Sequence, residues 1–155
     1  MRRTVQRALA ILFGSAALGL AFNAVSPRRI SYITPPKPVL QPKDTVSLDE
    51  AHRLWGEGAT FFLDARAPAD YAAGHIANAL SLPAENFDEH YPQIAPTLTT
   101  DTAIVAYCDG TECELSHELT KKLRDRGYTN VRILMNGWTS WHKAGYPTDT
   151  GTPPG

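Results

Sequence analysis

An apolar run that ends at a cysteine and is followed by a short acidic loop restricts the fold of this chain most. Residues 103–107 read Ala-Ile-Val-Ala-Tyr, which is typical of a buried strand, and Cys108 follows directly. Leucines at positions 115, 119 and 123 repeat every four residues, and Gly127 is a common stop signal, so we predict a helix over about 114–126. Cys108 should therefore lie at the carboxyl end of a strand and face the amino terminus of a helix.

This predicted position suits a reactive cysteine. The unpaired backbone N–H groups at the start of the predicted helix, and the positive end of its dipole, favour a thiolate over a thiol at Cys108. The thiolate is the nucleophilic form of cysteine, so the position favours nucleophilic chemistry near neutral pH. A buried, inert cysteine at a strand end explains the same residues equally well, because free cysteine is often a small core residue.

The remaining segments alternate between strands and helices. Ser47-Leu48-Asp49-Glu50 forms a capping box that predicts a helix through about Trp55. Further strands are expected at 61–63, 79–82 and 131–134, and further helices at 68–71 and 138–143, with residues 86–96 irregular and partly helical at best. This order predicts an α/β fold with a doubly wound, mainly parallel sheet and helices on both faces. Ligands bind such sheets at the carboxyl ends of strands, where Cys108 is predicted.

The amino-terminal segment has the composition of a signal anchor. Residues 8–25 contain no charged side chain and follow Arg2, Arg3 and Arg7, so we predict one transmembrane helix within residues 1–26. A cleaved secretory signal is the alternative. Residues 27–44 hold five prolines and should form a stiff tether, and residues 150–155 should form a disordered tail. The short amino-terminal tail favours a single-pass membrane protein whose domain is extracytoplasmic.

The distribution of charge excludes one class of partner. The formal net charge is -1, but the first 30 residues carry five arginines and no acid. Ten basic and sixteen acidic residues lie beyond them, so the globular part carries about -6. A nucleic-acid binder needs a concentrated basic face, and none is present, so we expect no nucleic-acid partner.

Four motifs occur in the order that is characteristic of one known family. They are Leu63-Asp64-Ala65-Arg66, then Tyr71-x-x-Gly74-His75-Ile76-Ala77-Asn78-Ala79, the loop after Tyr107-Cys108, and Gly137-Trp138 with Trp141, Ala144-Gly145 and Pro147. Over residues 45–149 the chain resembles the rhodanese-like domain, and the resemblance implies that the doubly wound, mainly parallel sheet has five strands. The resemblance implies a sulfurtransferase that takes sulfane sulfur onto Cys108 as a persulfide and passes it from a sulfur donor to a thiol acceptor. It also implies an active-site loop of Asp109, Gly110, Thr111, Glu112, Cys113 and Glu114. Asp64 and Arg66 either pair and position this loop or form only a structural bridge at the end of a strand.

The charge of this loop departs from the pattern of the family. Asp109, Glu112 and Glu114 surround the cysteine, and no lysine or arginine lies between Cys108 and Lys121. Negative side chains repel thiosulfate and oppose the helix dipole, so thiosulfate is a doubtful donor. The arginine that the phosphatase branch of the family needs to bind phosphate is missing as well, which argues against phosphatase activity.

The second cysteine leaves the function open. Cys113 is either a residue packed in the first turn of the helix or a resolving thiol that forms a disulfide with Cys108. The alternatives to a sulfurtransferase are therefore a thiol-disulfide protein that uses Cys108 and Cys113, and a non-catalytic binding module. Two cysteines fit neither a four-ligand zinc site nor a CxxC motif, so we expect no metal and no cofactor.

Overall fold

The computed structural model describes residues 42–110 and 114–152, together with short helical stretches at 6–7, 13–15, 18–19 and 21–22. The chain forms two compact units, residues 1–38 and residues 39–155. The fold and the site described below belong to the second unit.

A five-stranded parallel sheet forms the centre of this unit. Its strands lie in the order β1 (Thr45–Val46), β6 (Val131–Leu134), β5 (Ala103–Tyr107), β2 (Thr60–Asp64) and β4 (Leu80–Ser81). β3 (His75–Ile76) and β7 (Thr148–Asp149) form a separate antiparallel pair. β5 lies in the middle of the sheet and pairs with β2 over five residues, so Cys108 follows the central strand directly.

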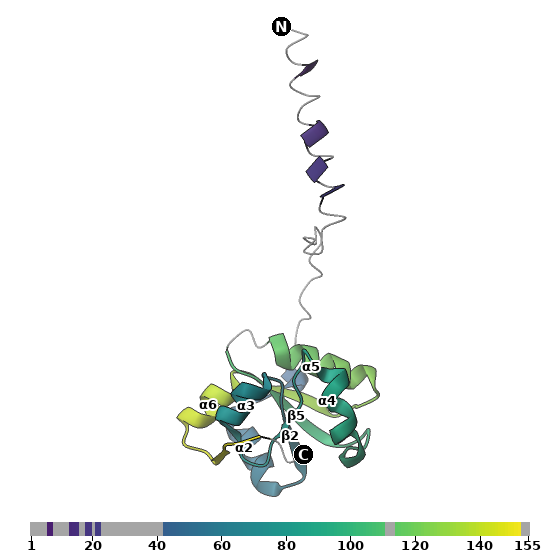
Figure 1. Ribbon diagram of the computed structural model, residues 1–155. Helices are drawn as coiled ribbons and strands as arrows, with labels where there is room; N and C mark the ends of the chain where they lie inside the picture. The colour runs from purple at the N-terminus through teal and green to yellow at the C-terminus, as the bar shows by residue number, and fades with distance from the viewer. Residues whose placement is uncertain are drawn as a thin grey trace. The chain divides into compact units, whose positions relative to one another are not determined.

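Helices cover both faces of this sheet, as predicted (Figure 1). The side chains of a strand alternate between the two faces, and β5 accordingly contributes Ile104 and Ala106 to one hydrophobic cluster and Val105 and Tyr107 to the other. The first cluster includes residues of α4 (Phe87–Ile94) and α5 (Glu114–Asp125). The second includes residues of α2 (Leu48–Glu57) and α6 (Gly137–Lys143), and α3 (Pro68–Ala73) follows β2.

Local sequence signals explain where most of these helices begin. Ser47 caps α2, because its hydroxyl accepts a hydrogen bond from the backbone N–H of Glu50 at 3.2 Å. Pro68 occupies the first position of α3, where its missing N–H costs nothing. One expectation was wrong: residues 87–94 form the helix α4, followed by a short 3₁₀ turn at Ala95–Thr97. Burial of Phe87 against the first cluster stabilises this helix even though it contains Pro92.

The predicted membrane span falls mostly on residues outside the described ranges. Among the residues that the structure describes, no helix has the length and apolar character needed to cross a bilayer. Most of the predicted tether, residues 27–41, also lies outside the described ranges, and its last residues form a 3₁₀ turn at Pro42–Asp44. The anchor and the tether therefore stay predictions.

Candidate active site

The sulfur of Cys108 is buried between the end of β5 and the first turn of α5. Cys108 is 1% exposed, and its Sγ lies 3.6 Å from the hydroxyl oxygen of Ser116, which is itself fully buried. Ser116 is the third residue of α5, a helix of twelve residues. The sulfur thus lies beside the positive end of a helix dipole and within reach of a hydroxyl donor, and both favour a negatively charged sulfur.

Cys108 is disulfide-bonded in this structure. The sequence contains one other cysteine, Cys113, which lies outside the described residues together with Thr111 and Glu112. The predicted roles of these three loop residues are therefore not tested. A disulfide sulfur is not nucleophilic, so any attack by Cys108 must follow reduction of this bond.

Asn136 and the first turn of α6 fix the first half of the active-site loop. The backbone N–H of Trp138 donates to the carbonyl of Cys108 at 3.2 Å, and the backbone N–H of Gly110 donates to the side-chain oxygen of Asn136 at 3.1 Å. The hydroxyl of Thr139 donates to the Asp109 carboxylate, which also accepts the N–H of Gly110 at 3.0 Å. Residues 108–110 are therefore held in place by contacts with residues 136–139.

Asp64 and Arg66 form the buried pair expected at the end of β2. Nε of Arg66 donates to Asp64 Oδ1 at 3.0 Å, and Nη2 donates to Asp64 Oδ2 at 2.6 Å and to the carbonyl of Gly74 at 2.7 Å. The Arg66 guanidinium also lies over the ring of Trp138, with 4.9 Å from its central carbon to the ring centroid. The pair thus connects β2, the start of β3 and α6 beneath the loop.

Electrostatics reinforce this pair. Burial by itself would lower the pKa of Arg66, but the hydrogen bonds and the charge of Asp64 raise it, so the net shift is upward. Burial and the charge of Asp64 also raise the pKa of Tyr107 far above its ordinary value. The hydroxyl of Tyr107 accepts a hydrogen bond from the backbone N–H of Ile76 at 3.2 Å. Arg66 therefore stays charged, and Tyr107 stays neutral, at every physiological pH.

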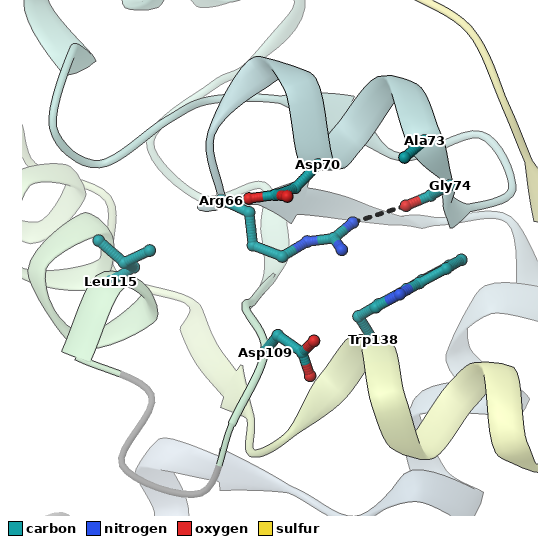
Figure 2. Close-up of a pocket in the computed structure, with 7 residues that line it drawn as sticks. All are labelled: Arg66, Asp70, Ala73, Gly74, Asp109, Leu115 and Trp138. Carbon is teal, nitrogen blue, oxygen red and sulfur yellow. Dashed lines mark hydrogen bonds between the residues drawn. The ribbon is translucent and has the colours of Figure 1, made fainter.

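A surface pocket of about 370 Å³ opens beside this pair (Figure 2). Its lining consists of Arg66, Asp70, Ala73, Gly74, Asp109, Leu115 and Trp138. Figure 2 shows the guanidinium of Arg66 between Gly74 and the indole of Trp138, with Asp109 on the side of the loop. Asp109 follows Cys108 and Leu115 follows Glu114, the exposed first residue of α5, so the pocket adjoins both described ends of the loop.

Sequence reasoning placed Cys108, Asp109, Gly110, Asp64 and Arg66 in one region, and the structure brings these residues together. It did not identify the contact of Ser116 with the sulfur, or Asp70 and Trp138 as pocket residues. Trp138 was recognised only as part of a motif. No sequence signal distinguished Ser116 from the other polar residues of α5.

The comparisons with known proteins define the class to which this fold and site belong. The sequence model of the rhodanese-like domain matches residues 47–144, which is more than half of the chain. The chain therefore belongs to the rhodanese-like domain family.

Two curated proteins and one solved structure illustrate what the chain is similar to. An HTH-type transcriptional regulator of Mycobacterium tuberculosis is 33% identical over 114 residues, which are 74% of this chain and 48% of that protein. A tRNA uridine(34) hydroxylase of Erwinia tasmaniensis is 32% identical over 57% of this chain and 25% of its own length. The chain thus spans less than half of these curated relatives. Among solved structures, a rhodanese-like domain from Anabaena is 30% identical with a TM-score of 0.59, over 72% of this chain and 86% of that one.

The fold also occurs in more distant structures. A thiosulfate sulfurtransferase from Pseudomonas aeruginosa is 24% identical with a TM-score of 0.58, over 69% of this chain and 20% of that one. At this identity the similarity shows a shared fold alone.

Proposed function

We propose that this protein is a sulfurtransferase that carries sulfane sulfur as a persulfide on Cys108 and passes it to a thiol acceptor. The observation that supports this most directly is the setting of the Cys108 sulfur, at the end of the central strand and 3.6 Å from the Ser116 hydroxyl in the first turn of α5. A hydroxyl donor and a helix dipole stabilise the thiolate and the persulfide anion alike.

The first half of the reaction loads the cysteine. A dithiol reductant first supplies two electrons and two protons to the disulfide and becomes a disulfide itself. The Cys108 thiolate then attacks the sulfane sulfur of the donor and forms a new S–S bond to it. The bond between that sulfur and the rest of the donor breaks, and its electron pair leaves with the donor.

The second half of the reaction transfers the sulfur from Cys108 to the acceptor. The thiolate of the acceptor attacks the outer sulfur of the Cys108 persulfide and forms an S–S bond to it. The bond between the two sulfurs on Cys108 breaks, and its electron pair returns the cysteine to a thiolate. Asp70 and Asp109 line the adjoining pocket, so a dianionic donor such as thiosulfate is repelled and a less charged donor is favoured.

Mass spectrometry of the reduced protein tests this proposal. The full chain is treated with polysulfide or with thiosulfate, beside the Cys108→Ser and Cys113→Ser variants. The expected result is a gain of one sulfur with polysulfide that requires Cys108 and survives Cys113→Ser, and a smaller gain with thiosulfate. Absence of added sulfur with both donors would overturn the proposal and favour a non-catalytic binding module.

A second candidate function is thiol-disulfide exchange through Cys108 and Cys113. The disulfide-bonded state of Cys108 favours it, because a bond that forms and breaks is what such a protein uses. In this case a reduced dithiol substrate would be oxidised while the protein gains two hydrogens, and Cys113→Ser would abolish the exchange. Turnover of a dithiol that persists in Cys113→Ser would exclude this function.

We also propose that the amino-terminal segment tethers the domain to a membrane and that the domain lies outside the cytoplasm. The support is the absence of charged side chains from residues 8–25. Membrane fractionation after alkaline extraction tests the tether. Protease added to intact cells tests the orientation of the domain. Release into the soluble fraction would contradict the tether, and protection from protease would contradict the orientation.

A further inference from the structure

We infer that the pocket beside Cys108 selects zwitterionic aminothiols as the acceptor, meaning small thiols that carry both an ammonium and a carboxylate group. This inference rests on the proposed function and names the class of molecule that removes the sulfur. Three features of the pocket support it: an open guanidinium nitrogen, two carboxylates without a matching cation, and a small volume.

Arg66 offers donors to an anion. It is 5% exposed and directed into the pocket, and its Nε and Nη2 are used by Asp64 and Gly74. Nη1 makes no hydrogen bond to any residue in the described part of the chain. A buried guanidinium with two unused N–H groups at a pocket wall is a site for one carboxylate.

The same pocket offers carboxylates to a cation. Asp70 is exposed and has no hydrogen bond or ion pair from its side chain among the described residues. Asp109 uses Oδ1 for the Gly110 N–H and the Thr139 hydroxyl, which leaves Oδ2 open. Because Asp64 already balances Arg66, the lining carries a net negative charge, and its described residues include no second cation. An ammonium group relieves this imbalance, whereas a second anion increases it.

The volume limits the size of the molecule. A pocket of about 370 Å³ is near the lower end of the range for small-molecule sites, so it suits a small metabolite rather than a long peptide. Asp109 is the residue directly after Cys108, so a molecule held by Asp109 and Arg66 lies next to the strand end that carries the loaded sulfur. A short thiol that carries one ammonium and one carboxylate pairs with the aspartates and with Arg66 at the same time.

A series of thiols with matched size and different charge tests this selection. Cys108 of the reduced protein is first loaded with polysulfide, and single-turnover loss of the extra sulfur is followed by mass spectrometry. The probes are cysteine, cysteamine, 2-mercaptoethanol and 3-mercaptopropionate at equal thiolate concentration. Each rate is divided by the rate with the same persulfide in urea-unfolded protein, which removes differences in intrinsic reactivity.

The expected order is cysteine, cysteamine, mercaptoethanol and mercaptopropionate, with about tenfold between the cationic and the neutral probe, or about 1.4 kcal/mol. Cysteine methyl ester, which lacks the carboxylate, should react more slowly than cysteine and so reports on Arg66 without mutation of a buried pair. Asp70→Asn should reduce the preference for cysteamine, while Glu85→Gln, an exposed residue outside the pocket lining, should not.

The outcomes separate this inference from the function on which it rests. If the persulfide forms and all four thiols remove it at the same normalised rate, the selection by charge is refuted and the sulfurtransferase proposal stands. If mercaptopropionate reacts fastest, the pocket favours anionic thiols over cationic ones, and the inference is refuted. If no persulfide forms on Cys108, the proposed function itself fails, and the inference fails with it.

Discussion

The hydroxyl of Ser116 should control the reactivity of Cys108. Ser116 is fully buried, and its oxygen lies 3.6 Å from the sulfur, so replacement by alanine removes a hydroxyl that can donate to the Cys108 thiolate in the reduced protein. Hydrogen bonds to charged groups contribute about 1.5–3 kcal/mol, and the large, diffuse sulfur places this one at the lower end. A loss of about 1.4 kcal/mol decreases the thiolate fraction about tenfold where the thiol predominates.

The observable effect is smaller and changes sign with pH. A less stabilised thiolate is more nucleophilic, with a Brønsted slope of about 0.4–0.5, so its intrinsic rate rises about threefold. Alkylation of the reduced Ser116→Ala variant by iodoacetamide should therefore be about threefold slower than wild type at low pH and about threefold faster at high pH. The two rate profiles should cross.

Thr120→Val is the matched control. Thr120 is a buried residue one helical turn further along α5, and its hydroxyl has no hydrogen-bond partner among the described residues. Its loss should leave the alkylation profile unchanged and should not decrease the free energy of unfolding, because an unsatisfied buried hydroxyl is costly. Coincident profiles for Ser116→Ala and wild type at both ends of the pH range would refute the role assigned to Ser116.

Three further predictions concern the support of the site. Gly137→Ala should decrease the free energy of unfolding by about 1–3 kcal/mol, measured in urea, because a Cβ there would lie 2.6 Å from Cβ of Tyr107; an unchanged midpoint would contradict this packing. Asp64→Asn should cost about 3–5 kcal/mol, because it leaves Arg66 buried without its counter-charge, and a midpoint within experimental error of wild type would show that the pair is dispensable. Burial, with a hydrogen bond between the Tyr128 and Tyr91 hydroxyls that favours the protonated Tyr128, raises the pKa of Tyr128 to about 12. The folded state therefore holds this proton more tightly than the unfolded state, so stability is retained below pH 10 and falls by about 1.4 kcal/mol per pH unit between about pH 10 and 12. The Tyr128→Phe variant should lose less over this interval, and equal losses would refute the assignment.

The sequence predicted the parts of the fold that have a strong local signal. The spacing of the leucines identified α5, the Ser47 capping box identified α2, and the apolar run before Cys108 identified β5. These elements depend on capping and on burial of one face, which are readable from neighbouring residues.

The missed elements lack such a signal. β1, β3 and β7 are two residues long and lack the apolar segment that predicted the equally short β4 at 79–82, so their pairing with a partner strand could not be read from neighbouring residues. Pro92 obscured α4, although Phe87, Tyr91 and Ile94 have helical spacing. The contact between Ser116 and the Cys108 sulfur joins a helix to the end of a strand, which only the assembled fold brings together.

Asn136 and the first turn of α6 separate what is fixed in this site from what redox chemistry can change. These residues bind the Cys108 carbonyl, the Gly110 amide and the Asp109 carboxylate, and they supply the indole on which Arg66 stacks. None of these contacts involves the disulfide, so opening that bond removes none of the hydrogen bonds that hold Asp109 and Trp138 at the pocket. The charge of the pocket is therefore set by the fold, and the state of the sulfur is set by the redox environment. Under the proposed function, recognition of an acceptor and readiness to transfer sulfur would therefore be separable, and each could be altered by substitutions that leave the other intact.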